Sequence, residues 1–153
     1  MTLVELVKQG FEELLGIDYS EKAVDLAREI LKENNMPRVE LKVCDVLDSK
    51  NFDLPANFKL AHDKGTYDAI SLNPENPASK RQKYIENVYR ILLPSGYLVL
   101  TSCNWTKEEI EKHFQNCKLY QINNNKLHLL LSFFSLSLTF DNQKLFTQCC
   151  TVN

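Results

Sequence analysis

Apolar and polar residues recur along the chain in two periods, one typical of helices and one typical of strands. After Ser20, apolar side chains return every three or four positions, which predicts an amphipathic helix that begins at a serine cap. These positions are Ala23, Val24, Ala27, Ile30 and Leu31. Further along, Val39, Leu41 and Val43 alternate with polar residues, which predicts a half-exposed strand.

The same two periods predict a regular succession of helices and strands. The remaining elements are a helix from residue 2 that stops at Gly10, strands at 14–17, 58–61 and 97–103, a helix up to 92, and a helix behind the capping box Thr106 to Glu109. Strands that alternate with helices favour an α/β fold with a doubly wound, mostly parallel sheet.

The pattern changes beyond residue 122. The stretch KLHLLLSFFSLSLTF is rich in Leu, Phe and Ser, and no turn signal divides it. We therefore divide the chain into an α/β domain at 1–122 and a tail at 123–153, which we expect to be disordered or irregular β.

Composition and charge narrow the classes of partner and of site. The chain has 153 residues and a formal net charge of −2, so nucleic acid and membranes are not the expected partners. Its start has no basic segment before an apolar core, so we expect no signal peptide. The five cysteines form no CxxC pair and the histidines have no ligand spacing. Free thiols in the cytosol and no metal are therefore expected.

Three predicted strands are followed by an aspartate, namely Asp18, Asp45 and Asp63. Ligands of open α/β sheets bind at the carboxyl ends of the strands. A carboxylate after Ile17 suits the paired hydroxyls of a ribose, and one after Cys44 suits an adenine amine, with Val46 against the ring. Aspartate is also common in turns, so each of these residues alone has a purely structural explanation.

The segment HDKGTYDAISLNP at residues 62–74 is the most specific of these strand ends. Gly65 permits a sharp turn and a close approach of a ligand to the backbone, with Asp63 projecting into the crevice. Alternatively, Asp63 or Thr66 caps the helix that starts here. Both interpretations stay open at this point.

Four segments together carry a resemblance to a known family. GIDYS, VCDVLD, DKGTYDAISLNP and TSCNWTKEE resemble, in order, the seven-β-strand protein-lysine methyltransferases that use S-adenosylmethionine, in particular the group that methylates translation elongation factor 1-alpha. The resemblance covers about residues 3 to 120. It implies a Rossmann-like fold, lysine methylation, elongation factor 1-alpha as partner, and a location in the cytoplasm or also the nucleus.

The resemblance also implies roles for single residues. Asp18 and Tyr19 correspond to the ribose contact, and Asp45 and Val46 to the adenine contact. Asp63 corresponds to the catalytic acid beside the methyl group and the incoming lysine. For the substrate we add two aromatic residues, Tyr67 and Trp105, although packing onto Ile110 is the more ordinary explanation for Trp105.

The chain departs from the family at both ends. The family begins with a strand and a glycine-rich loop that holds the cofactor, whereas the first element expected here is the helix after that loop. We therefore expect a sheet that lacks its first strand, with unpaired backbone groups on its neighbours. A truncated, catalytically inactive product with at most a binding function is the alternative to an active enzyme. A methyltransferase for small molecules or nucleic acid is a weaker third alternative.

Overall fold

A computed structural model of the chain describes residues 2–115, 128–131 and 145–149. The helices are α1 (Thr2–Lys8), α2 (Glu21–Glu33), α3 (Thr66–Ser71), α4 (Pro77–Ile91) and α5 (Lys107–Gln115). The strands are β1 (Leu14–Asp18), β2 (Glu40–Val43), β3 (Phe58–Lys64), β4 (Leu92–Thr101), β5 (His128–Leu131) and β6 (Leu145–Cys149). All strand pairs in the described residues are parallel, and they form one sheet with the order β2-β1-β6-β3-β4-β5.

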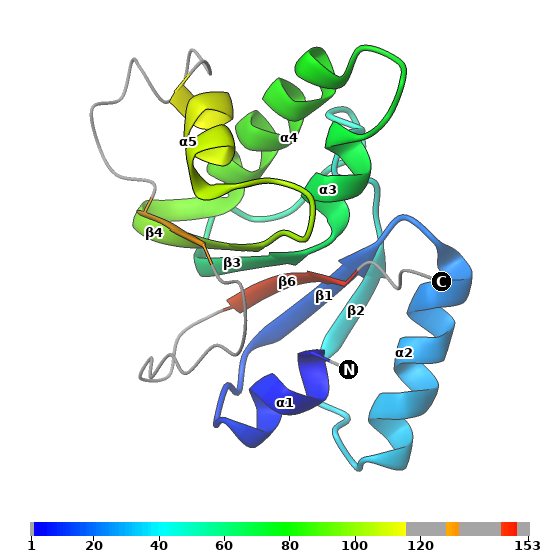
Figure 1. Cartoon of the computed structure of the whole chain (residues 1–153). Coiled ribbons are helices and arrows are strands. Elements are labelled where there is room, and N and C mark those ends of the chain that lie inside the picture. The colour runs from blue at the N-terminus through cyan, green and yellow to red at the C-terminus, as the bar shows by residue number, and fades with distance from the viewer. Residues whose placement is uncertain (1, 116–127, 132–144, 150–153) are drawn as a thin grey trace.

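Helices cover both faces of this sheet, as Figure 1 shows. Helices α3, α4 and α5 lie on one face, and their side chains enclose a core that includes Tyr67, Tyr84 and Phe114. Helices α1 and α2 lie on the other face, over a second core that includes Leu3 and Leu31. The predicted doubly wound α/β fold is therefore confirmed. No helix in the described part of the chain is long and apolar enough to cross a membrane.

Two predicted helix caps are present. The backbone N–H of Ala23 donates to the hydroxyl of Ser20 at 3.4 Å, at the start of α2. Before α5, the N–H of Thr106 donates to the Glu109 carboxylate at 2.9 Å, and the N–H of Glu109 donates to the Thr106 hydroxyl at 3.3 Å. These reciprocal bonds satisfy donors that have no partner within the first turn of a helix.

The transition from α4 to β4 differs from the prediction. We expected a turn at residues 94–96 and a strand from Tyr97, but β4 begins at Leu92, directly after α4. Phe58 of β3 pairs with Leu92 and Leu60 pairs with Tyr97, so the register shifts between these pairs. The turn-forming residues are accommodated in this irregularity, where Ser95 has a φ of +63°.

The centre of the sheet corrects a second expectation. Strand β6 lies between β1 and β3 and is parallel to both, with Thr147 paired to Gly16 on one side and to His62 on the other. The flanking strands therefore do not have the unpaired backbone groups that we expected there. No strand precedes α1 in the described residues, and the proposed domain boundary after residue 122 lies outside them.

Candidate functional site

The three predicted aspartates lie at one edge of the sheet. Asp18 ends β1, Asp63 lies one residue before the end of β3, and Asp45 follows β2 by two residues. The carboxyl ends of parallel strands meet at the same edge, so all three backbones share it. Because β6 separates β1 from β3, the strands that carry Asp18 and Asp63 are about 10 Å apart.

The side chains of Asp18 and Asp63 leave the sheet on opposite faces. Ala61 belongs to the core under α3, α4 and α5, and Asp63, two residues later, bonds to Tyr84 in that layer. Asp18 lines a cavity with Leu3 and Ala23, on the face covered by α1 and α2. The two acids therefore share an edge, but their carboxylates do not point toward a common centre.

Asp18 has one carboxylate oxygen without a partner. The side chain is 5% exposed, and its Oδ1 accepts a hydrogen bond of 2.9 Å from the N–H of Ser20. Its Oδ2 is buried, and no hydrogen-bond donor reaches it among the described residues. Burial raises the pKa of Asp18, and the backbone N–H bonds of Ser20 and Tyr19 oppose this rise. A ligand that donates a hydrogen bond to Oδ2 would therefore remove the free-energy cost of this unpartnered oxygen, which favours binding of that ligand.

The other predicted cofactor contacts differ in their exposure. Tyr19 is 68% exposed beside Asp18, and Asp45 is exposed, with its Oδ1 accepting from the N–H of Leu47 at 2.8 Å. Val46 is buried in the core, and its carbonyl accepts from the Asn87 amide at 2.7 Å. Tyr19 and Asp45 are accessible to a ligand, whereas the Val46 side chain faces the core.

Asp63 is held inside the protein by three groups. Its carboxylate accepts from the N–H groups of Thr66 and Tyr67 at 3.0 and 3.1 Å, and from the Tyr84 hydroxyl at 2.6 Å. Desolvation raises its pKa to about 7, against the effect of these hydrogen bonds. The carboxylate thus caps the start of α3, which Gly65 makes possible with a φ of +95°. Its predicted contact with a substrate amine stays a prediction.

Of the two predicted aromatic contacts, Tyr67 is fully buried and Trp105 is half-buried. Tyr67 has no exposed surface, and its hydroxyl lies 2.8 Å from Nδ1 of His113. Trp105 is half-buried against the core, edge-on to the His113 ring at a centroid distance of 5.0 Å, and its Nε1 is buried without a partner in the described residues. In this conformation the Tyr67 ring is covered, so its predicted substrate contact also stays a prediction.

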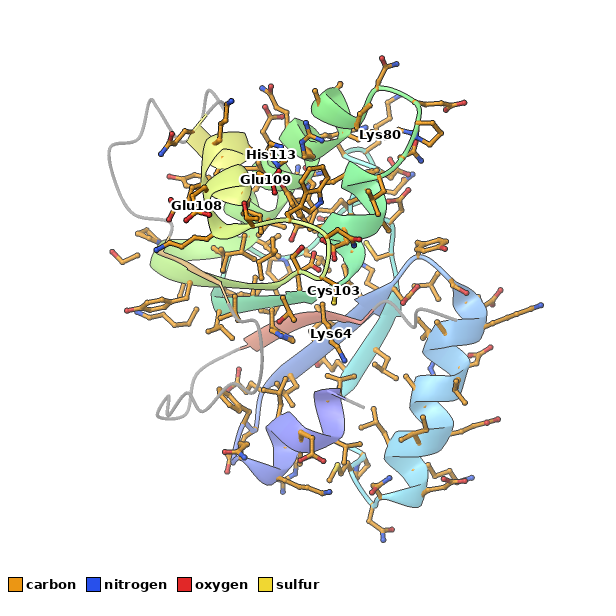
Figure 2. The ribbon with its side chains drawn as sticks, viewed as in Figure 1. Lys64, Lys80, Cys103, Glu108, Glu109 and His113 are labelled. Atoms are coloured by element: carbon orange, nitrogen blue, oxygen red, sulfur yellow. The ribbon has the colours of Figure 1, made fainter. Side chains whose placement is uncertain are left out.

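Asp68 is a structural residue whose role the sequence analysis missed. Its carboxylate accepts from the Ser102 hydroxyl at 2.6 Å, the N–H of Cys103 at 2.9 Å and the amide of Asn104 at 2.9 Å. Asp68 therefore holds the segment after β4, where Figure 2 labels Cys103, against α3. The signal was present in the sequence, because Asp68 belongs to DKGTYDA and its three partners belong to SCNW, the two segments noted together above.

The described residues offer a ligand acidic and aromatic groups. Within residues 2–115, 128–131 and 145–149, no three His, Cys, Asp or Glu side chains are grouped so as to hold a metal ion. The edge of the sheet instead presents one unpartnered carboxylate oxygen, an exposed tyrosine and an exposed carboxylate. This set suits a ligand with hydrogen-bond donors and an aromatic ring.

Comparisons with known proteins identify relatives of the chain. It is 44% identical to the human "EEF1A lysine methyltransferase 2" over 112 residues, which are 73% of this chain and 47% of the relative. The zebrafish protein of that name is 41% identical over 115 residues, 75% of this chain and 48% of the relative. The fission yeast "Protein-lysine N-methyltransferase efm4" is 36% identical over 105 residues, 67% of this chain and 44% of the relative.

The chain thus spans about half the length of the curated relatives that it matches. No solved structure gives a significant match. The family described as "Methyltransferase domain" matches residues 2–148, which include α1, every described strand up to β6 and all three aspartates. Enzymes of this kind generally use S-adenosylmethionine as the methyl donor. On the strength of this match over nearly its whole length, the chain belongs to the methyltransferase domain family.

Proposed function

We propose that the chain functions as an S-adenosylmethionine-dependent protein-lysine N-methyltransferase whose substrate is translation elongation factor 1-alpha. The observation that carries the proposal is the similarity to relatives whose names state lysine methylation, of EEF1A in the human and zebrafish proteins. The family match over residues 2–148 includes the acidic strand ends. The parallel sheet and the end of β1 support it, because Oδ2 of Asp18 has no donor among the described residues and is able to accept from a ligand.

The residues at the end of β1 suit the adenosine part of the cofactor. A ribose hydroxyl would supply the hydrogen bond that Oδ2 of Asp18 lacks. Exposed Tyr19 lies next in sequence, and the exposed carboxylate of Asp45 is available to an adenine amine. Val46 would contribute through the backbone, since its side chain belongs to the core.

In methyl transfer, the main task of the protein is to position the methyl donor and the lysine amine. When bound, S-adenosylmethionine supplies a methyl group that its sulfonium sulfur has already activated. The lysine nitrogen attacks with its lone pair, so the amine has to lose its proton first, which a desolvated site favours. We propose Asp63 as the acid near this amine. The donors Thr66 N–H, Tyr67 N–H and Tyr84 hydroxyl would hold it in one orientation.

Cofactor binding is the first test. Calorimetric titration of the folded chain with S-adenosylmethionine should give saturable heat, and Asp18→Asn should weaken binding about tenfold by removing a charged acceptor. Asp25→Asn is the matched control, because Asp25 is an exposed residue of α2 that pairs only with Arg28 in the described structure. An absence of heat up to millimolar cofactor, in a sample with a cooperative unfolding transition, would overturn the proposal.

Substrate and site are tested together by methyl transfer. Elongation factor 1-alpha incubated with the chain and isotope-labelled cofactor should gain label on lysine, located by mass spectrometry. Asp63→Asn should reduce labelling, while Asp25→Asn should not. Equal labelling by the Asp63 variant would remove Asp63 from its proposed role.

The alternative is a catalytically inactive chain with a binding role. The observation that favours it is that the Asp63 oxygens already accept hydrogen bonds from Thr66, Tyr67 and Tyr84, together with the complete burial of Tyr67. A chain that binds cofactor and elongation factor 1-alpha without transferring label would establish this alternative.

A further inference from the structure

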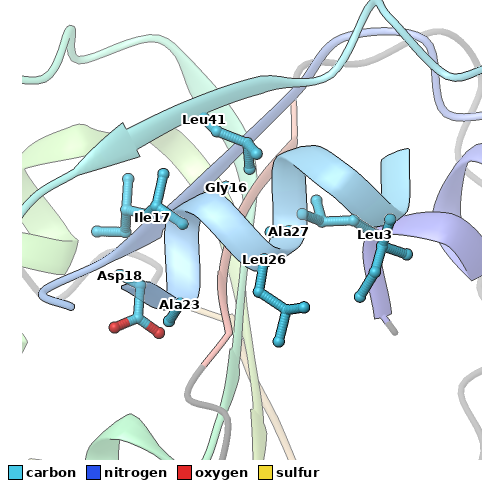
Figure 3. Close-up of a pocket in the computed structure, with 10 residues that line it drawn as sticks. Leu3, Gly16, Ile17, Asp18, Ala23, Leu26, Ala27 and Leu41 are labelled. Carbon is cyan, nitrogen blue, oxygen red and sulfur yellow. The ribbon is translucent and has the colours of Figure 1, made fainter. Parts of the chain in front are cut away.

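A cavity of about 150 Å³ lies between α1, α2 and β1 (Figure 3). Its wall is apolar apart from one acid at the end of β1. The lining residues are Leu3, Gly16, Ile17, Asp18, Ala23, Val24, Leu26, Ala27, Ile30 and Leu41. Of these residues, Asp18 alone also has a role in the proposed function, where its Oδ2 would accept from a ribose hydroxyl.

Small residues line part of the cavity, although Leu41 and Leu3 fill the space beside Gly16, where they lie 2.8 and 2.9 Å from the position that a Cβ atom would take. Helix α2 lines it with Ala23 and Ala27, one turn apart, and β1 lines it with Gly16. Larger residues stand at the margins, and Leu26 is 48% exposed although it is a leucine. An apolar cavity with an exposed apolar margin is accessible from solvent. An apolar group that fills it is removed from water and gains contacts, so its binding is favourable.

Asp18 makes this apolar cavity favour a ligand that carries a hydrogen-bond donor. Its Oδ1 is occupied by the N–H of Ser20, whereas its buried Oδ2 has no donor in the described residues. A buried carboxylate oxygen without a donor costs free energy, and a positively charged donor offsets that cost most effectively. In Figure 3 the carboxylate lies beside Ala23, at the end of the row of cavity residues that α2 contributes.

We propose that this cavity binds a small primary amine whose apolar part is the size of a phenyl ring or a branched five-carbon chain. The apolar part fills the space between Ala27, Leu3 and Leu41, and the ammonium group donates to Oδ2 of Asp18. Apolar cavities of about 150 Å³ accept molecules the size of benzene, so the volume matches this class. Binding of the amine requires no methyl transfer, but the amine and the ribose proposed above would both use Oδ2 of Asp18, so each would exclude the other.

Three probes of similar shape distinguish the contribution of cavity filling to affinity from the contribution of ligand charge. Benzylamine has the ring and the ammonium group, toluene has the ring alone, and benzoate has the ring with a negative charge. We expect benzylamine to bind more tightly than toluene and benzoate to bind least, because its carboxylate would lie against that of Asp18. A surface that binds a membrane or a protein would not give this order of affinities for the three probes.

The test is a titration of the full chain, followed by two-dimensional NMR of backbone amides. Benzylamine should shift the amide signals of Gly16, Ala23 and Ala27 in a saturable manner. Ala27→Leu fills the cavity and should lower the affinity at least about tenfold, since leucine occupies the space of the ligand. Ala78→Leu, the same change at an exposed position of α4, should leave the affinity unchanged.

Asp18→Asn tests the polar half of the site. It should lower the affinity for benzylamine to about that for toluene, because the charged acceptor is gone. The proposal is overturned if benzylamine leaves the cavity amides unshifted, if Ala27→Leu binds it as the parent chain does, or if toluene binds equally well to the parent chain. None of these results would decide whether the chain methylates lysine.

Discussion

At the residue scale, Asp63 and its neighbour His62 influence stability in opposite directions as pH changes. The pKa of Asp63 is raised to about 7, so above the ordinary value of 3.8 the folded chain keeps a proton that the unfolded chain releases. This contribution makes the free energy of unfolding fall as pH rises from about 4 to about 7. Burial lowers the pKa of His62 from 6.5 to about 4, which makes the free energy rise over nearly the same interval.

The first prediction is that Asp63→Asn removes the contribution of Asp63 to the pH dependence of the unfolding free energy and leaves the contribution of His62. In the variant, the free energy of unfolding at pH 7 minus that at pH 5 should be more positive than in the parent chain, by about 2 kcal/mol. Urea unfolding at the two pH values measures this difference, and the variant's overall loss of stability cancels from it. Asp25→Asn is the control, since that residue is exposed. An unchanged difference would contradict the proposed protonation of Asp63.

The second prediction concerns Asp68, which joins α3 to the segment after β4. Asp68→Ala leaves the Ser102 hydroxyl, the Cys103 N–H and the Asn104 amide without their acceptor. Loss of the charged acceptor of the buried Ser102 hydroxyl and of two part-buried donors should cost about 3 kcal/mol of unfolding free energy, with Asp68→Asn losing less. Chemical denaturation measures the loss. A change as small as that of the exposed Asp25→Ala would refute the structural role.

At the scale of elements, the central position of β6 makes a short terminal segment decisive for stability. The Thr147 backbone pairs with Gly16 in β1 and His62 in β3. Proline has no N–H and is not tolerated in a central strand, so Thr147→Pro should destabilise the chain by about 3 kcal/mol or more. Thr147→Val keeps the N–H and should cost far less. Thermal unfolding followed by circular dichroism compares the two, and similar midpoints would argue against a central β6.

The elements with strong local signals were predicted from the sequence, and those that depend on distant partners were not. The α2 cap at Ser20 and the α5 capping box involve residues three positions apart, so sequence patterns reveal them. In the described part of the chain, the ladder partners of β6 are β1 and β3, which lie more than 80 positions earlier. No local pattern in Leu145–Cys149 indicates this placement. The irregular start of β4 likewise depends on its pairing with β3.

The features of the candidate site also fall into those that the sequence predicted and those that it did not. The aspartates at strand ends and the turn at Gly65 followed from the alternation of elements, which fixes the edge of a parallel sheet. The face on which each side chain lies depends on single-residue register. For that reason the opposite orientations of Asp18 and Asp63 and the burial of Tyr67 were not predicted.

At the scale of the whole molecule, β6 joins two halves that would otherwise have separate sheets. One half contains β1 and β2, the other contains β3, β4 and β5, and the strand order connects them only through β6. The core under α3, α4 and α5 crosses this division, since Ile17 and Cys44 belong to it together with Ala61 and Phe114. We therefore expect the described domain to unfold in one cooperative transition.

The last prediction tests this cooperativity with one probe in each half. Trp105 is the single tryptophan and reports on the half with α5, while buried Cys44 follows β2 and becomes reactive to thiol reagents when its half opens. In urea, the Trp105 emission and the Cys44 labelling measured on its own peptide should share one midpoint. Their extrapolated free energies should agree within about 15%. In Thr147→Pro the midpoints should separate, because the two halves lose the strand that joins their ladders. Separate midpoints in the parent chain would mean that β6 does not link the halves.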